Sequence, residues 1–179
     1  MGTLLAGSAL FGFSRLPYDD SLSGLGVSAS YATDILPFVF MMSFGMGLTF
    51  VPLTLTAVHG VAAADSGIGS GVLNTMQQVG GALGLATLST VAVHFSTDKA
   101  DALGRAAGEL AQRTGQAPTG EQQRAFAHNL ANVAFTDGAT HAFLVGAGMI
   151  WLGTLIAVVF MNAKHEEIAA DGHEAVPVA

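Results

Sequence analysis

Long runs without charged side chains dominate the chain. No Asp, Glu, Lys or Arg occurs in three runs of 30, 32 and 26 residues, at 35–64, 66–97 and 138–163. About 20 helical residues cross the hydrocarbon core of a bilayer, and lipid offers the backbone no hydrogen-bond partner. The runs are continuously apolar and do not alternate as the strands of a membrane barrel would. The pattern therefore predicts membrane-spanning helices at 35–58, 67–94 and 142–162.

Residues 1–14 form a shorter apolar segment, which ends at Arg15 and Pro17. The segment is too short to span a membrane and lacks the basic start of a signal peptide. We interpret it as a truncated transmembrane helix, so we expect the chain to be a fragment of a longer parent. Within the span 35–58, Pro52 removes one helical hydrogen bond, and we expect a kink there.

The segment 96–141 is polar and carries nine charged side chains. A charge at the bilayer centre costs at least about 2.5 kcal/mol, which excludes this segment from lipid. Apolar residues recur at helical spacing in both of its halves, and Thr119 and Gln122 are spaced as in a capping box. We therefore predict an extramembrane loop with two short amphipathic helices, broken around 114–120. The acidic end, 163–179, is predicted to be a disordered tail.

The composition supports a membrane protein and excludes several other classes. Only 11% of residues are charged, whereas about a quarter is typical of soluble domains. The net charge of −7 and the absence of a basic cluster exclude a nucleic-acid binder, and the hydropathy excludes a disordered chain. The chain has no cysteine, and its six histidines show no pair at metal-ligand spacing, so we expect no metal site. No Ser/His/Asp arrangement stands out, and we expect neither an enzyme nor a bound cofactor.

One face of the helix expected at 67–94 carries small and amide side chains. At about 100° per residue, a narrow stripe contains Gly67, Gly71, Asn74, Gln78 and Gly81, with Gln77 at its border. The opposite face is apolar and suits lipid: Ile68, Val72, Met76, Val79 and Leu83. Gly67 with Gly71, and Gly80 with Gly84, have the spacing that lets helix backbones approach closely. Two interpretations remain open for the amides, namely hydrogen bonding to a packed neighbour and lining of a polar cavity.

Two stretches resemble a known family. Gly45-Met-Gly-Leu-Thr-Phe-Val-Pro52 and Asn74-Thr-Met-Gln-Gln-Val-Gly-Gly-Ala-Leu-Gly84 are similar to late helices of the major facilitator superfamily. The resemblance is greatest to its fourteen-helix drug:proton antiporter subfamily, the EmrB/QacA type. It implies an all-α, polytopic transmembrane bundle, with the segments of this chain as the C-terminal spans eleven to fourteen. It also implies a multi-pass protein of the plasma (inner) membrane, with the polar loop outside the cell and the tail inside.

The resemblance further implies a function. The parent would be a secondary active transporter that exports drugs or other small amphipathic molecules in exchange for protons, with the lipid bilayer as its surroundings. The substrate-cavity candidates are Asn74, Gln77 and Gln78, followed by Met76 and Phe50. The helix-packing candidates are the glycines Gly67, Gly71, Gly80, Gly81 and Gly84. Two rivals are a small standalone membrane protein with a binding or regulatory role, and the permease subunit of another transporter class.

Overall fold

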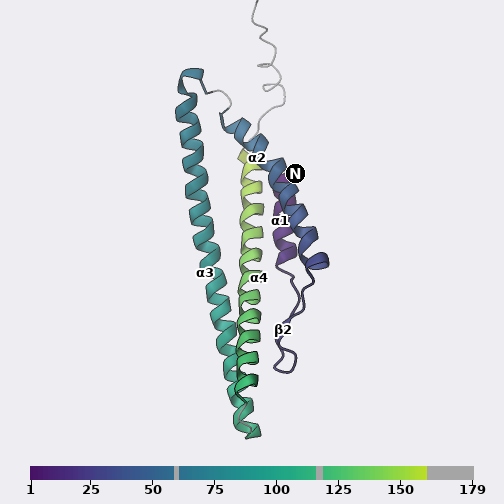
Figure 1. Cartoon of the computed structure of the whole chain (residues 1–179). Coiled ribbons are helices and arrows are strands. Elements are labelled where there is room, and N and C mark those ends of the chain that lie inside the picture. The colour runs from purple at the N-terminus through teal and green to yellow at the C-terminus, as the bar shows by residue number, and fades with distance from the viewer. Residues whose placement is uncertain (59–60, 116–118, 161–179) are drawn as a thin grey trace, which may run out of the picture.

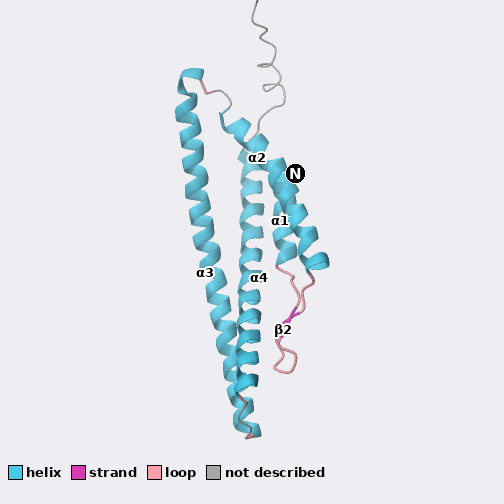
Figure 2. Ribbon diagram, in the orientation of Figure 1, coloured by secondary structure: helices cyan, strands magenta, loops and turns pink. Residues whose placement is uncertain are grey.

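The computed structural model describes residues 1–58, 61–115 and 119–160, and it is mostly helical (Figures 1 and 2). The elements in chain order are α1 (Gly2–Phe13), β1 (Tyr18–Asp19), β2 (Gly26–Val27), η1 (Tyr31–Ile35), α2 (Leu36–Val58), η2 (Ala63–Asp65), α3 (Ser66–Thr114) and α4 (Gly120–Phe160). Three of the described helical segments are long and apolar enough to cross a membrane, namely Tyr31–Leu55, Ser66–Thr114 and Gly120–Val159. The prediction of a mostly helical fold with long apolar helices is thereby confirmed. The tail expected at 163–179 lies outside the described residues.

The two long helices continue past the ends of the expected spans. α3 has 49 residues and α4 has 41 residues. The short amphipathic helices expected within 96–141 are therefore the ends of these two long helices, and not separate elements. The physical reason is that no proline or left-handed residue interrupts α3 before Gly115, whose φ of 65° ends the helix.

The chain reverses direction between α3 and α4, within the break expected at 114–120. α4 starts with the expected capping box. The backbone N–H of Gln122 donates to the Thr119 hydroxyl over 3.4 Å, and the backbone N–H of Thr119 donates to the Gln122 side-chain oxygen over 3.0 Å. These two bonds satisfy helix-terminal N–H groups that have no partner within the helix.

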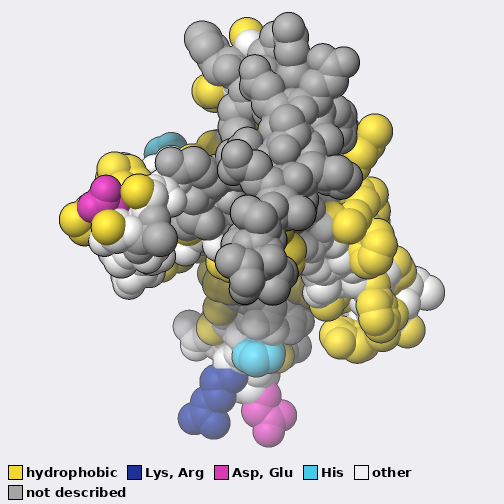
Figure 3. All heavy atoms as spheres, turned by 90° about the horizontal axis from the view of Figure 1, so that it is seen from above, with side chains coloured by type: hydrophobic (Ala, Val, Ile, Leu, Met, Phe, Trp, Pro, Cys, Tyr) yellow, Lys and Arg dark blue, Asp and Glu magenta, His cyan; other side chains and the backbone are white. Residues whose placement is uncertain are grey.

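α1 packs against both α2 and α4 through glycines. A Cβ atom on Gly45 of α2 would lie 2.7 Å from the Ala6 nitrogen and 2.8 Å from the Gly2 carbonyl oxygen of α1. A side chain on Gly7 would overlap the Trp151 ring of α4. The missing side chain at Gly45 thus lets the α1 and α2 backbones approach closely, and the missing side chain at Gly7 leaves room for the Trp151 ring. Many large hydrophobic side chains are exposed outside these contacts, and in the view from above they gather mainly along one side of the described residues (Figure 3).

α3 meets α4 most closely around Gly138. A Cβ atom on Gly138 would overlap the Ser96 hydroxyl and the Ala92 carbonyl oxygen. Beyond this crossing, toward the turn at Gly115, the two helices run side by side (Figure 1). The connection between α1 and α2, here called the connecting segment (residues 14–30), lies against them and contains the antiparallel β1–β2 pair. A small apolar core joins the three parts, consisting of Leu25, Leu103 and Val133, with Tyr18, Leu22, Phe126 and Leu130 packed around it.

Candidate functional site

The amide and glycine stripe of α3 has no neighbour within the described chain. Asn74, Gln77 and Gln78 are exposed, and no residue from 66 to 90 is buried. The glycines expected to pack are equally open, because a Cβ atom would meet nothing within 4 Å at any of Gly67, Gly71, Gly80, Gly81 and Gly84. Whether the stripe packs or lines a cavity therefore stays a prediction.

The remaining candidates from the sequence also lie on open helix surface. Met76 of α3 is 66% exposed and Phe50 of α2 is 54% exposed. Pro52 lies inside α2, four residues after Leu48, whose carbonyl loses its usual helical donor. The structure does not bring Phe50 together with the amides into one site within the described residues. Close glycine contacts occur elsewhere, among them those at Gly7, Gly45 and Gly138.

The charged residues that border the uncharged runs meet at one level of the molecule. Lys99 follows the run 66–97, and Asp137 immediately precedes the run 138–163. The Lys99 ammonium lies 3.8 Å from an Asp137 carboxylate oxygen and 2.5 Å from a carboxylate oxygen of Asp20 in the connecting segment. This level is where α3 and α4 would leave a membrane, because their charged positions begin here.

Asp137 is the centre of this group and is only 7% exposed. The Tyr18 hydroxyl donates to the Asp137 carboxylate over 2.7 Å, from a position 119 residues away in the sequence. His141 Nδ1 lies 3.5 Å from the other carboxylate oxygen and 2.8 Å from the Asp137 carbonyl oxygen. Because a carbonyl oxygen only accepts, Nδ1 carries the hydrogen. We call these five residues the Asp137 cluster: Tyr18, Asp20, Lys99, Asp137 and His141.

The aromatic rings in and beside the cluster fix its geometry. The His141 ring stacks on Phe95 of α3, with centroids 3.9 Å apart and planes 6° from parallel. The Lys99 ammonium lies 5.7 Å from the Tyr18 ring centroid, within the range of a cation–π contact. The first contact thus joins α4 to α3, and the second joins α3 to β1. The cluster ties β1, α3 and α4 to one another.

Burial and the contacts within the cluster shift the pKa values of two groups in the connecting segment. Burial, and then the hydrogen bond to the Asp137 carboxylate, raise the pKa of Tyr18 to about 12. The hydrogen bond from the Lys99 ammonium holds the pKa of Asp20 below its usual value. At neutral pH the phenol is thus a donor and the Asp20 carboxylate an acceptor, as the observed contacts require.

Sequence reasoning missed this cluster, because it treated the charges of 96–141 as a solvated surface. One signal was present: Asp137 and His141 are four residues apart on one helix, next to a long uncharged run. The partners Tyr18 and Asp20 lie more than a hundred residues away in the sequence, and no local pattern pairs them with Asp137.

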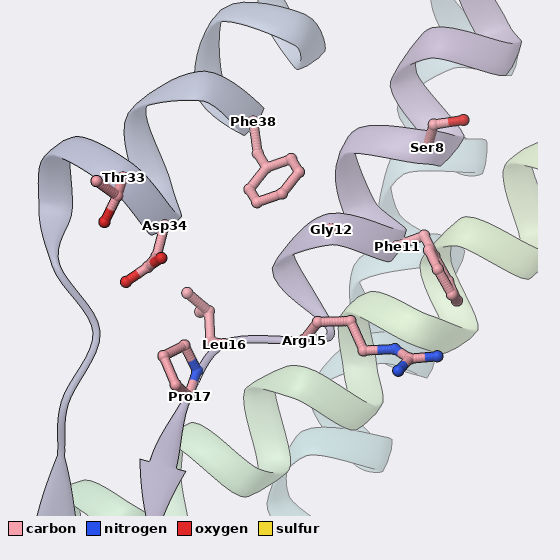
Figure 4. A pocket seen from close by; sticks show the side chains of 9 residues that line it. All are labelled: Ser8, Phe11, Gly12, Arg15, Leu16, Pro17, Thr33, Asp34 and Phe38. Carbon is pink, nitrogen blue, oxygen red and sulfur yellow. The ribbon is translucent and has the colours of Figure 1, made fainter.

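A pocket of about 440 Å³ opens between the end of α1 and the start of α2 (Figure 4). Its lining residues are Ser8, Phe11, Gly12, Arg15, Leu16, Pro17, Thr33, Asp34 and Phe38. Phe38 points toward Gly12, whereas the Arg15 guanidinium extends away from Asp34 and lies 5.0 Å from the Phe11 ring centroid (Figure 4). The two charges on its wall therefore do not converge on a common point. Among the described residues, no three His, Asp or Glu side chains are grouped as a metal site would require.

Two known proteins are similar to this chain. The puromycin resistance protein pur8 of Streptomyces alboniger is 29% identical over 153 residues, which cover 83% of this chain and 25% of that protein. The cephamycin export protein CmcT of Amycolatopsis lactamdurans is 44% identical over 63 residues, which cover 35% of this chain and 13% of that protein. No protein-family model matches the chain, and no solved structure matches it significantly.

The matched regions thus span a quarter or less of the length of these two relatives. The names of the two relatives describe resistance to an antibiotic and export of an antibiotic. The chain is a distant homologue of this puromycin resistance protein and this cephamycin export protein, and its helical fold with three long apolar helices is consistent with part of a major facilitator transporter.

Proposed function

We propose that the chain forms the C-terminal part of a secondary active transporter of the fourteen-helix drug:proton antiporter type. The parent would reside in the plasma (inner) membrane and export drugs or other small amphipathic molecules in exchange for protons. The similarity to a puromycin resistance protein and a cephamycin export protein supports this proposal, as does the coverage of a quarter or less of their lengths. Such transporters bind substrate near the membrane midplane, between two halves that rock against each other.

The observation that carries the proposal is the open polar stripe of α3. Asn74, Gln77 and Gln78 lie on a helix long and apolar enough to span the membrane, yet no part of the described chain covers them. An amide left unpaired in lipid costs several kcal/mol, so this stripe requires protein or water from beyond the described residues. Further helices of a larger transporter would supply both.

The two sides of α3 then take different roles. The amides Asn74, Gln77 and Gln78 would face the substrate cavity, with Met76 and Phe50 as weaker candidates. The glycines of the same helix would let neighbouring helices approach closely. The apolar side, with Ile68 and Leu83 largely exposed, would face lipid.

An export assay on the complete reading frame tests this proposal. Cells that express the parent should accumulate less puromycin, or less of a cephamycin-type β-lactam, than cells without it. Gln78→Leu should change which compounds are exported while the amount of protein in the membrane stays the same. Gly71→Leu should lower that amount, because a large side chain would block close packing.

Val79→Leu, on the apolar side of the same helix, is the matched control and should change neither the export profile nor the amount of protein. If Gln78→Leu exports every compound as the unmodified parent does, the cavity role is wrong and the amides serve packing. The proposed drug export itself is wrong if cells that express the unmodified parent export none of the compounds tested, and if the amount of compound in these cells does not respond to the proton gradient.

A further inference from the structure

The connecting segment, residues 14–30, touches the α3–α4 pair in two places. Leu25 packs into the apolar core with Leu103 and Val133. Tyr18 and Asp20 contact Asp137 and Lys99 through the Asp137 cluster. The same segment leads directly from α1 into η1 and α2. Together with the direct contact of α1 and α4 at Gly7 and Trp151, this segment therefore joins the α1–α2 pair to the α3–α4 pair.

The Asp137 carboxylate has its full set of partners only while the connecting segment is docked on α3 and α4. Asp137 is buried, and its nearest Lys or Arg side chain within the described chain, Lys99, lies 3.8 Å away and is shared with Asp20. Tyr18 supplies the one hydroxyl hydrogen bond that the carboxylate accepts from the connecting segment. A buried carboxylate that loses such a partner is left under-satisfied, which is costly.

The exposed pair of His94 and Asp98, at the same level of the molecule, serves as a comparison for the buried Asp137 cluster. His94 and Asp98 lie 3.5 Å apart on α3, and their side chains are 67% and 64% exposed. Such exposed pairs contribute little to stability. The Asp137 cluster differs from this pair in its burial and in joining three elements.

We propose that the Asp137 cluster is a latch, which holds the connecting segment on α3 and α4 so that the two helix pairs stay joined at the membrane boundary. Asp137 is the fixed part on α4, Lys99 is the bridge on α3, and Tyr18 with Asp20 form the movable part. The inference concerns contacts within this chain and does not depend on drug export by a parent protein.

The test measures the position of the connecting segment directly. The chain has no cysteine, so cysteines introduced at Ser28 and Ala127, both exposed, carry two nitroxide labels without further changes. Pulsed electron paramagnetic resonance on the full chain in detergent or liposomes should give one narrow distance distribution. Asp137→Asn should add a broad, longer-distance population, and Tyr18→Phe and Lys99→Met should each add a smaller one.

Asp98→Asn is the matched control. It removes the carboxylate of the exposed His94–Asp98 pair, which lies on α3 at the same level as Asp137. It should leave the distance distribution unchanged. Far-ultraviolet circular dichroism establishes that each variant keeps its helices. If Asp137→Asn does not fold, the distance distribution of Tyr18→Phe, which removes one oxygen atom only, tests the proposal instead. Limited trypsin digestion gives a second reading: cleavage after Arg15 should be roughly tenfold faster in Asp137→Asn, the size expected for a lost hydrogen bond to a charged group.

Two results would overturn the latch. One is a distance distribution in folded Asp137→Asn and Tyr18→Phe that equals that of the unmodified chain. The other is release of the segment by Leu25→Ala alone, with no effect of any cluster variant, which would assign the docking to the apolar core.

Discussion

At the scale of single residues, the absence of one side chain decides where α3 and α4 cross. Gly138 faces Ala92 and Ser96 so closely that a Cβ atom would overlap both. The glycines that the sequence singled out on α3 are open in this chain, whereas Gly138 is in contact. Spacing identifies small residues that could pack, but the partner surface decides which of them do.

Gly138→Ala tests this crossing. We expect the substitution to lower the free energy of unfolding by about 1–3 kcal/mol, since the overlap includes backbone atoms that cannot move aside. Gly104→Ala is the control, because a Cβ there meets nothing within 4 Å on the same helix pair. That change should stabilise the chain by up to about 1 kcal/mol through helix propensity. Denaturant unfolding in detergent measures both, and equal effects would contradict the crossing.

Tyr18 gives a second prediction at this scale. The chain has two tyrosines, so Tyr31→Phe leaves Tyr18 as the single phenol. Its ultraviolet phenolate absorbance should titrate with a midpoint of about 12 instead of 10.0. Asp137→Asn should lower the midpoint only part of the way, because burial is the largest cause of the shift and hydrogen bonding the second.

The sign of the pH effect on stability follows from this shift. The neutral phenol is favoured in the folded chain, so its contribution to stability is complete below pH 10 and is lost as the pH rises from about 10 to about 12. A midpoint near 10 in the Tyr31→Phe chain would show that the phenol is not held by Asp137.

At the scale of elements, the helices could be predicted from the sequence but their lengths could not. The charge-free runs indicate where apolar helices lie, because lipid burial and charge exclude each other. The same rule says nothing of where a helix ends once it has left the membrane. α3 continues to Thr114 because its polar half packs against α4 and no stop residue intervenes until Gly115.

Gly115→Ala should therefore weaken the turn between the two long helices. Gly115 has a φ of 65°, a left-handed conformation that costs a residue with a side chain about 1–2 kcal/mol. We expect a loss of unfolding free energy of this size, measured in denaturant. Gly108→Ala, seven residues earlier in the same helix and in open space, should be neutral or stabilising. Equal losses in both variants would contradict a special role of the turn conformation.

At the scale of the whole molecule, the partners of the Asp137 cluster show the limit of local reasoning. Capping and helical spacing depend on residues close in sequence, and the capping box at Thr119 and Gln122 is confirmed. The contact between Tyr18 and Asp137 joins residues 119 positions apart, which only the packing of the connecting segment determines. The open stripe of α3 has no neighbour among the described residues, so the proposed partners of its amides belong to a still larger scale.

The orientation of the molecule in the membrane is a further prediction at this scale. The family resemblance implies that the polar segment 96–141 lies outside the cell, whereas its four Lys and Arg residues would favour the inside by charge alone. In cells that express the parent, a cysteine at Gln123 should react with a membrane-impermeant maleimide. A cysteine at Ala62 should react only after permeabilisation. The reverse pattern would show that the charge rule determines the orientation.

The close contact at Gly138 also has a mechanical consequence. Ser96 lies 30 positions after Ser66, which corresponds to about 45 Å of helix at about 1.5 Å per residue. With the contact at Ala92 and Ser96 as a fulcrum, a tilt of α3 by about 10° moves its first turn by about 8 Å and its last turn at Thr114, 18 positions beyond Ser96, by about 5 Å. α3 is thus a lever, whose long free arm carries Asn74, Gln77 and Gln78.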